Sequence, residues 1–335
     1  MQLIVRVTNV CNFKCTFCSA SNLSKTQQLS LDSLIEFVRQ YQNDVNSIAF
    51  EGGDPLCVKP DYYHQFFKWK DANPKLKNVD VTFTSNLWDF YKHPDKWIDL
   101  FNREDVDIGT SFQYGDARRV TDSLVYTEDL FKTVFNKVVD ATGKVPGFIT
   151  VIDNTNQHTI EKTCLLAKSL NTVCKINPLF YSGRADSFYR WDLMLLRYAD
   201  LFEQNLDQYE INCRMIRSII DNRPDRVGCP FHSRNCNNDF RVINPDGYIK
   251  TCSIDQNLSQ GGGIPITVFK RGQLFDITTN SKISLSSSKC LTCAYYRWCN
   301  NCRIKIMEFK TISDHDQYCT NIKTAIDRIT KVIHG

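Results

Sequence analysis

The sequence predicts an α/β fold, a partial (β/α)6 barrel followed by a small cysteine-rich domain. The first observation behind this prediction is an alternation of short apolar runs with amphipathic stretches from residue 1 to about residue 180. The second is the cysteine content: the chain has 15 cysteines in 335 residues, and their density rises after residue 228. Together they indicate a regular N-terminal domain and a C-terminal domain that depends on cysteine ligands.

Six apolar runs are typical of buried strands: Leu3–Val7, Ser47–Phe50, Val79–Thr84, Val106–Phe112, Phe148–Ile152 and Val173–Leu179. Helix-like stretches lie between them, at Leu31–Tyr41, Asp61–Trp69, Asp95–Phe101, Thr127–Ala141 and Thr159–Leu170. Strands that alternate with helices predict a parallel sheet with helical crossovers. Six such units are two short of a closed eight-stranded barrel, and in barrels of this kind the active residues lie at the carboxyl ends of the strands.

We expect three regions along the chain: the barrel over residues 1–185, a helical bridge over residues 186–228 and the cysteine-rich domain over residues 229–335. Ser30 is expected to cap the helix that begins at Leu31. Further helices are predicted over Ile211–Ile220 and Thr320–Ile333. Four scattered cysteines without ligand spacing are expected in the hydrophobic core, namely Cys57, Cys164, Cys174 and Cys213.

The composition, with 42% hydrophobic and 23% charged residues, is that of a soluble globular protein. No apolar run approaches the ~20 residues that span a bilayer, and Arg6 interrupts the N-terminal apolar stretch, so we expect neither a membrane partner nor a signal peptide. The formal net charge of +4 is too small to indicate an anionic partner. We therefore expect a cytoplasmic protein, in which an odd total of 15 cysteines indicates metal binding or catalysis and not disulfides.

The densest motif follows the first predicted strand and reads Cys11-Asn12-Phe13-Lys14-Cys15-Thr16-Phe17-Cys18. Three cysteines at the spacing CX3CX2C can hold three corners of a cubic iron–sulfur cluster. The missing fourth ligand is informative, because catalytic metal sites keep one position open for a substrate or cofactor. A zinc site or a disulfide cluster with the same spacing is the alternative.

Polar segments also follow the next three predicted strands. Glu51-Gly52-Gly53-Asp54-Pro55 comes after the second strand, and its glycines would let the backbone approach a ligand beside a carboxylate, although an ordinary turn is the alternative. Ser85-Asn86 ends the third strand and Ser111 the fourth. Arg118 and Arg119 follow, and a guanidinium suits a carboxylate ligand, whereas a solvated loop face is the other interpretation.

The CX3CX2C motif, its place after the first strand and Phe17 before the last cysteine resemble the radical S-adenosylmethionine (SAM) superfamily. The resemblance implies a TIM-like partial barrel in which the open iron binds the amino and carboxylate groups of SAM. An electron from the reduced cluster would then give methionine and a 5′-deoxyadenosyl radical that abstracts hydrogen from a substrate. Asp54 replaces the usual glutamate of the family's GGEP motif. By position in the family's motifs, the SAM contacts would be Phe17, Gly52, Gly53, Asp54, Ser85, Asn86, Ser111, Leu179 and Arg119, with Arg118 as the alternative to Arg119.

Eight cysteines lie after residue 228, and their spacing, with Gly247 five residues before Cys252, resembles the SPASM extension of peptide-modifying radical SAM enzymes. The central block of this extension reads Cys290-X2-Cys293-X5-Cys299-X2-Cys302 in this chain. Its last gap is one residue shorter than in the family's usual pattern, CX2CX5CX3C. The resemblance implies two auxiliary 4Fe–4S clusters, hence three in the chain. The first would use Cys229, Cys236, Cys252 and Cys302, and the second Cys290, Cys293, Cys299 and Cys319. Structural zinc held by CX2C pairs is the alternative.

The resemblance implies a maturase that crosslinks, oxidises or epimerises a peptide or protein side chain, supplied with electrons by a flavodoxin or ferredoxin. Sulfatase maturation itself is disfavoured, because Ser253 stands where those enzymes carry an aspartate base, and the nearest carboxylate is Asp255. We expect no leader-peptide-binding domain before the first strand.

Two alternatives to the maturase stay open. The first is a radical SAM enzyme that acts on a nucleotide, nucleobase or small polar metabolite. The second is a zinc-stabilised nucleic-acid-binding module in which Tyr295, Tyr296 and Trp298 stack on bases. If the cysteines hold iron–sulfur clusters, we expect these aromatic side chains to shield the clusters from solvent.

Overall fold

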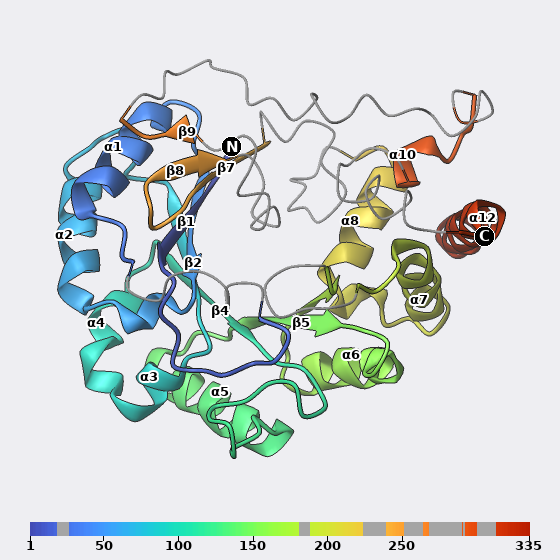
Figure 1. Ribbon diagram of the computed structural model, residues 1–335, viewed down its shortest axis with the longest axis horizontal. Coiled ribbons are helices and arrows are strands. Elements are labelled where there is room, and N and C mark those ends of the chain that lie inside the picture. The colour runs from blue at the N-terminus through green and yellow to red at the C-terminus, as the bar shows by residue number, and fades with distance from the viewer. Residues whose placement is uncertain are drawn as a thin grey trace. The chain divides into compact units, whose positions relative to one another are not determined.

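The computed structural model describes residues 1–18, 27–180, 188–223, 239–250, 264–267, 290, 292–299 and 313–335 (Figure 1). The chain forms two compact units. The first comprises Met1–Ile149, Tyr181–Asp186 and Cys236–Phe275, and the second Thr150–Phe180, Ser187–Asn235 and Asp276–Gly335. The predicted boundaries at residues 185 and 228 lie outside the described residues and stay predictions.

The strands form one sheet whose order is β6-β5-β4-β3-β2-β1-β7-β8-β9. Neighbouring pairs from β1–β2 to β4–β5 are parallel, as is β1–β7, whereas β7–β8 and β8–β9 are antiparallel. The strand bounds are β1 Gln2–Thr8, β2 Ser47–Gly52, β3 Asp80–Thr84, β4 Val106–Ser111, β5 Gly147–Ile152, β6 Cys174–Pro178, β7 Phe240–Ile243, β8 Tyr248–Lys250 and β9 Ile264–Pro265.

Helices connect the strands, and in the first unit α1, α2 and α4 line the outer side of β1 to β3 (Figure 1). The α-helices are α1 Leu31–Tyr41, α2 Pro60–Asp71, α3 Trp88–Lys92, α4 Ile98–Phe101, α5 Glu128–Thr142, α6 Ile160–Ser169, α7 Trp191–Glu203, α8 Ile211–Ile220, α10 Tyr296–Cys299 and α12 His315–His334. Single 3-10 turns occur at Pro55–Cys57, Pro94–Lys96, Gln157–Thr159 and Asp207–Tyr209. Within the part of the chain that is described, no helix is both long and apolar enough to cross a membrane.

The six strands and four of the five crossover helices predicted from the sequence are confirmed, with no end displaced by more than two residues. The Ser30 side chain accepts a hydrogen bond from the Ser33 amide (3.1 Å) and so caps α1 as expected. The continuous helix predicted over Asp95–Phe101 is wrong. Pro94 instead begins a tight 3-10 turn that ends at Lys96, and only Ile98–Phe101 is α-helical, because Trp97 between them has a φ of −119°, far from the helical value of about −63°. The strands β7 to β9 were not predicted.

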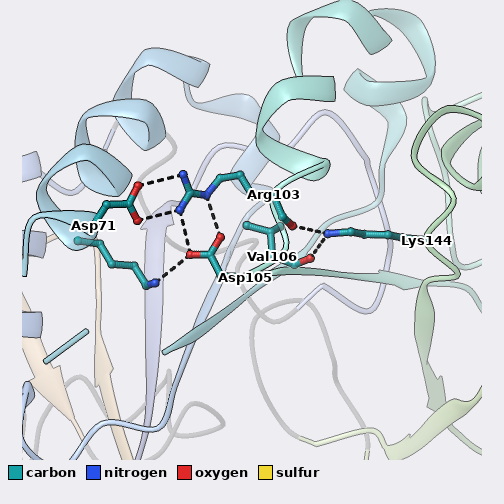
Figure 2. A network of polar contacts seen from close by, with 6 residues as sticks. Asp71, Arg103, Asp105, Val106 and Lys144 are labelled. Atoms are coloured by element: carbon teal, nitrogen blue, oxygen red, sulfur yellow. Dashed lines mark hydrogen bonds and ion pairs between the residues drawn. The ribbon is translucent and has the colours of Figure 1, made fainter. Parts of the chain in front are cut away.

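A charged network closes the amino-terminal end of β4 (Figure 2). The fully buried Lys70 ammonium donates to Asp105 (2.9 Å), and Arg103 bridges Asp105 (2.9 Å) and Asp71 at the end of α2 (2.8 Å). Burial alone would raise the pKa of the Asp105 carboxyl, but the hydrogen bonds from Arg103 and Lys70 lower it overall. Lys144 donates to the carbonyl of Arg103 (2.6 Å) and also to that of Val106. This end of a barrel typically serves stability, which leaves the carboxyl ends of the strands for chemistry.

In the second unit, side chains occupy the free edge of β6 in place of another strand. The Ile176 amide donates to the Glu210 carboxylate (2.8 Å), and the Ile176 carbonyl accepts from the Tyr198 hydroxyl (2.5 Å) and the Asn212 amide (2.8 Å). Glu210 also accepts from the Cys213 amide (2.6 Å) and thereby caps α8. An unpaired strand edge is open to wrong pairing, and these contacts satisfy its central residue within the fold.

Stability should depend on the protonation of Glu210. Burial raises its pKa from 4.5 to about 7, and the hydrogen bonds from Ile176, Cys213 and Asn212 only partly oppose that shift. Because the folded pKa is the higher one, the stabilising contribution of the neutral acid is present below pH 4.5 and is lost as pH rises through about 7. The free energy of unfolding should therefore fall between these pH values, relative to Glu210→Gln, by about 3 kcal/mol, at 1.36 kcal/mol per pKa unit.

Urea unfolding of the wild-type protein and of Glu210→Gln at about pH 5, 6, 7 and 8 measures how the difference in the free energy of unfolding changes with pH. Cys213, Cys174 and Tyr198 face Glu210, and burial raises the pKa of each well above its ordinary value, so they stay neutral over the range. Equal pH dependence in the wild-type protein and the variant would contradict the prediction.

Candidate functional site

The cysteine loop, residues 11–18, leaves the carboxyl end of β1 and is held against the segment that follows β4. The Lys14 amide donates to the Arg119 carbonyl (2.8 Å) and the Thr16 amide to the Ala117 carbonyl (2.9 Å). Cys11, Cys15 and Cys18 are all partly exposed. Burial, and next the nearby charge of Asp54, raise the pKa of the Cys11 thiol well above its ordinary value. A bound metal cation would reverse such a shift, because ligating thiols are deprotonated.

Gly52 and Gly53 make room for this loop and not for a ligand directly. A Cβ on Gly52 would lie 2.3 Å from the Thr8 carbonyl oxygen, and one on Gly53 would lie 2.2 Å from that of Val10. The Gly53 amide donates to Thr8 (2.7 Å) and the Asp54 amide to Val10 (2.8 Å). The close approach that requires glycine is therefore between the end of β2 and the residues that lead into Cys11.

The Asp54 carboxylate joins the ends of β2 and β3. It accepts hydrogen bonds from the Leu56 amide (2.9 Å), the Ser85 hydroxyl (2.9 Å) and the Asn86 amide (2.7 Å). Burial raises the pKa of Asp54 to about 6, against the lowering effect of these hydrogen bonds and of Arg118. Asp54, Ser85 and Asn86, all predicted to contact a cofactor, are thus brought together by hydrogen bonds from Ser85 and Asn86 to the Asp54 carboxylate.

Of the two candidate arginines, Arg118 faces the interior. Its side chain is only 7% exposed, and it donates to the Ser111 hydroxyl (2.6 Å). Its guanidinium lies over the rings of Phe13 (5.2 Å) and Tyr126 (5.5 Å), and its Nε has no hydrogen-bond partner among the described residues. Arg119 instead donates to the Asp122 carbonyl (2.8 Å) at an exposed position. A buried guanidinium with an unused donor beside a serine hydroxyl suits a carboxylate ligand.

Two residues of this region were not assigned a role from the sequence, and a third was expected in the core. Phe13, and not Phe17, is the buried aromatic of the loop, and its ring packs on Tyr126 (5.0 Å) and Trp88 (6.2 Å). Asn12 accepts from the Asn86 side chain (2.6 Å). Cys57 was expected in the core, and that expectation is wrong: it is partly exposed, and it interacts electrostatically with Cys11. It differs from the buried Cys164, Cys174 and Cys213 because it follows Asp54 by three residues and stays at the strand end.

Four of the C-terminal cysteines are among the described residues, and all four belong to the second unit. Cys290 and Cys293 lie in a turn closed by a hydrogen bond from the Cys293 amide to the Cys290 carbonyl (3.3 Å), Cys299 ends α10, and Cys319 lies in α12. Burial, and then the proximity of Cys290, raise the pKa of the Cys319 thiol. The four thiols predicted for the second auxiliary cluster therefore belong to neighbouring segments. The predicted residues Cys229, Cys236, Cys252, Cys302 and Asp255 lie outside the described residues.

The aromatic residues beside these cysteines are used in packing within the second unit. Trp298 is 5% exposed, and its carbonyl accepts from the Trp191 indole (2.8 Å). The Tyr295 hydroxyl donates to Asp327 of α12 (2.5 Å). A buried ring cannot stack on a base. This arrangement therefore favours the other interpretation, in which Trp298 shields the cysteine ligands from solvent.

Cysteine thiolates are the usual ligands of iron–sulfur clusters. The described cysteines fit such clusters, because each group offers thiols from one loop or from neighbouring segments. Across the described ranges, no three His, Cys, Asp or Glu side chains are arranged closely enough to hold a single metal ion. The assignment of individual ligands therefore stays a prediction. Leu179, predicted to contact the cofactor, lies in the second unit, where its amide donates to the Ile152 carbonyl (2.8 Å).

Residues 5–167 match the family model described as the Radical SAM superfamily. A cysteine-type anaerobic sulfatase-maturating enzyme of Clostridium novyi (strain NT) is 22% identical over 197 residues, which cover 56% of this chain and 48% of that protein. The chain thus spans about half the length of the curated relative that it matches.

Two solved structures share the fold. Native anSMEcpe with bound AdoMet (SAM) and Cp18Cys peptide has a TM-score of 0.69 at 15% identity, over 99% of this chain and 98% of that chain. Streptococcus suis SuiB bound to precursor peptide SuiA has a TM-score of 0.62 at 15% identity, over 89% and 70%. At this level of identity the likeness concerns the fold, and it confirms the predicted α/β partial barrel.

Replacing Gly53 by alanine should displace the cysteine loop. Its Cβ would overlap the Val10 backbone, whereas a Cβ on Gly109 in β4 would meet no atom closer than 3.5 Å. We expect Gly53→Ala to lower the free energy of unfolding by about 1–3 kcal/mol, the usual cost of overpacking. It should also reduce the iron bound after anaerobic reconstitution. Gly109→Ala is the matched control and should change both quantities little. Similar iron content and stability in the two variants would show that the close approach is not needed.

Proposed function

The chain belongs to the radical SAM superfamily through residues 5–167, and we propose that it cleaves SAM reductively and abstracts hydrogen from a peptide or protein side chain. The observation that carries this proposal is the cysteine loop: three thiols at the end of β1, held in place from β2 and from the segment after β4. Three protein ligands leave the fourth corner of a cubic cluster open for a cofactor.

When bound, the cluster and SAM supply a 5′-deoxyadenosyl radical, which is the chemistry that no side chain provides. The residues of the chain bind and orient. Arg118 and the Ser111 hydroxyl offer donors for the methionine carboxylate, and the unpartnered Nε of Arg118 is an observation that supports this assignment over Arg119. Phe13 and Tyr126 cover the guanidinium and keep water from it. Asp54 holds Ser85 and Asn86 at the carboxyl end of β3 through hydrogen bonds to its carboxylate.

In this proposal the C-terminal cysteines hold two auxiliary 4Fe–4S clusters, the second on Cys290, Cys293, Cys299 and Cys319. The electrons come from a low-potential protein such as flavodoxin or ferredoxin, and the cytoplasm, where such donors occur, is the proposed location. The neighbourhood of Cys290 and Cys319 supports the second cluster.

A peptide substrate is favoured because two proteins of the same fold bind peptides: anSMEcpe with the Cp18Cys peptide and SuiB with the precursor peptide SuiA. The reaction class is a side-chain modification such as crosslinking, oxidation or epimerisation. Maturation of sulfatases is not proposed, since Ser253 follows Cys252 where an aspartate would be needed as the base.

Cys15→Ala should abolish the conversion of SAM to 5′-deoxyadenosine, because it removes one of only three thiols in the loop. Anaerobically purified wild-type protein should be brown, with on the order of twelve irons per chain for three clusters, and the variant should lose about a third of them. Dithionite-reduced protein with SAM, followed by chromatography of the nucleosides, measures the reaction.

Cys164→Ala is the control, since Cys164 is fully buried in the second unit and lies 3.9 Å from the Cys174 sulfur, away from the loop in sequence. It should retain both iron and activity. SAM cleavage that persists in Cys15→Ala would show that the loop is not the site, and a colourless wild-type protein that holds zinc would overturn the enzyme assignment.

Peptides should stimulate SAM cleavage above the slow background seen without substrate, because a bound substrate commits the radical to productive hydrogen abstraction. We expect at least one member of a panel of synthetic peptides that together present all natural side chains to increase 5′-deoxyadenosine formation and to change mass. A matched panel of nucleosides should do neither. Stimulation and mass change confined to the nucleosides would replace the maturase by the nucleotide-modifying alternative.

A further inference from the structure

We propose that Asn86 is a positioning residue that donates a hydrogen bond to the Cys11 sulfur and so raises the reduction potential of the cluster bound there. The proposal rests on the proposed function and gives Asn86 a task different from the SAM contact predicted from the sequence. The Asn86 side-chain nitrogen lies 3.8 Å from the Cys11 sulfur and 2.6 Å from the Asn12 side-chain oxygen. Asn86 is 5% exposed, so it acts within the protein interior.

The orientation of the Asn86 amide is fixed by its other end. The Trp88 amide donates to the Asn86 side-chain oxygen (2.9 Å), which leaves the NH2 group, and not the oxygen, directed at the cysteine loop. The Asn86 main-chain amide is itself held by Asp54 (2.7 Å). The main-chain amide and the side-chain amide of Asn86 are therefore both held in place by the protein itself.

The turn that aims Asn86 is strained. Leu87 has φ 61°, in the left-handed region that side chains other than glycine avoid, and it is fully buried. Such a conformation costs on the order of 1–3 kcal/mol and persists only where the surroundings impose it. Here the Leu87 amide is held by the Ser85 hydroxyl (2.9 Å), which also bonds to Asp54. The strain is thus maintained by the same carboxylate that holds Asn86.

Hydrogen bonds to cluster sulfurs stabilise the reduced form, because reduction adds negative charge that N–H donors attract. Cys11 accepts from the Phe13 amide (3.3 Å) as well as from Asn86. Of the two donors to Cys11, only Asn86 belongs to another strand end and can be removed by a side-chain substitution.

The test is an EPR-monitored redox titration of the reconstituted full-length protein, in which the SAM-binding cluster is identified by the change that SAM produces in its signal. Asn86→Ser retains a hydroxyl that can accept from the Trp88 amide, as serine does in such turns, but it cannot reach Cys11. Asn86→Ala removes both contacts. We expect both variants to lower the midpoint potential by about 59 mV, which is a tenfold change for one electron.

Asn156→Ala is the matched control. Asn156 is also 5% exposed, and its amide donates to the Val151 carbonyl (3.0 Å) in the second unit, so its loss should affect stability and leave the potential unchanged. A SAM-responsive wild-type cluster whose midpoint neither Asn86 variant changes would overturn this inference alone. A wild-type protein whose clusters do not respond to SAM would overturn the proposed function, and this inference with it.

Discussion

The site depends on the contact between the end of β2 and the backbone that follows β1. The Gly53 and Asp54 amides donate to the carbonyls of Thr8 and Val10, at a separation that admits no Cβ on Gly53. Because main-chain groups make this contact, it fixes the course of the chain into Cys11 whatever the side chains around it. The neighbouring Asp54 carboxylate then extends the same constraint to the end of β3 through Ser85 and Asn86.

This arrangement explains why a buried carboxylate stands beside thiols whose ligand form is negative. Asp54 accepts three hydrogen bonds and lies near the Arg118 guanidinium, which offset the cost of burying it. Its role in the described structure is to organise strand ends. Three donors then remain for the proposed cofactor: Arg118 through its Nε, the Asn86 amide and the Ser111 hydroxyl. A site of donors suits an anionic cluster and a carboxylate.

The two ends of the strands therefore have different duties. At the amino-terminal end of β4, ion pairs join Lys70 to Asp105, and Arg103 to both Asp105 and Asp71 (Figure 2). At the carboxyl ends, backbone strain at Leu87 and an unpartnered guanidinium nitrogen at Arg118 persist. Strain and unsatisfied polar groups are tolerated where a ligand or a reaction benefits from them.

The sequence by itself determined the six-strand alternation, most of the helices and the cysteine motif, because hydrophobic period and ligand spacing are local properties. It did not determine which of two adjacent arginines turns inward, since Arg118 and Arg119 have the same chemistry and main-chain contacts, among them the bridge of Arg119 to Val125, set their alternation. Nor did it predict that β7 pairs with β1, a contact between residues more than two hundred apart. The glycines of Gly52-Gly53 were correctly associated with a close approach, but the tertiary structure decided that the partner is the backbone of Thr8 and Val10, which leads into the cysteine loop.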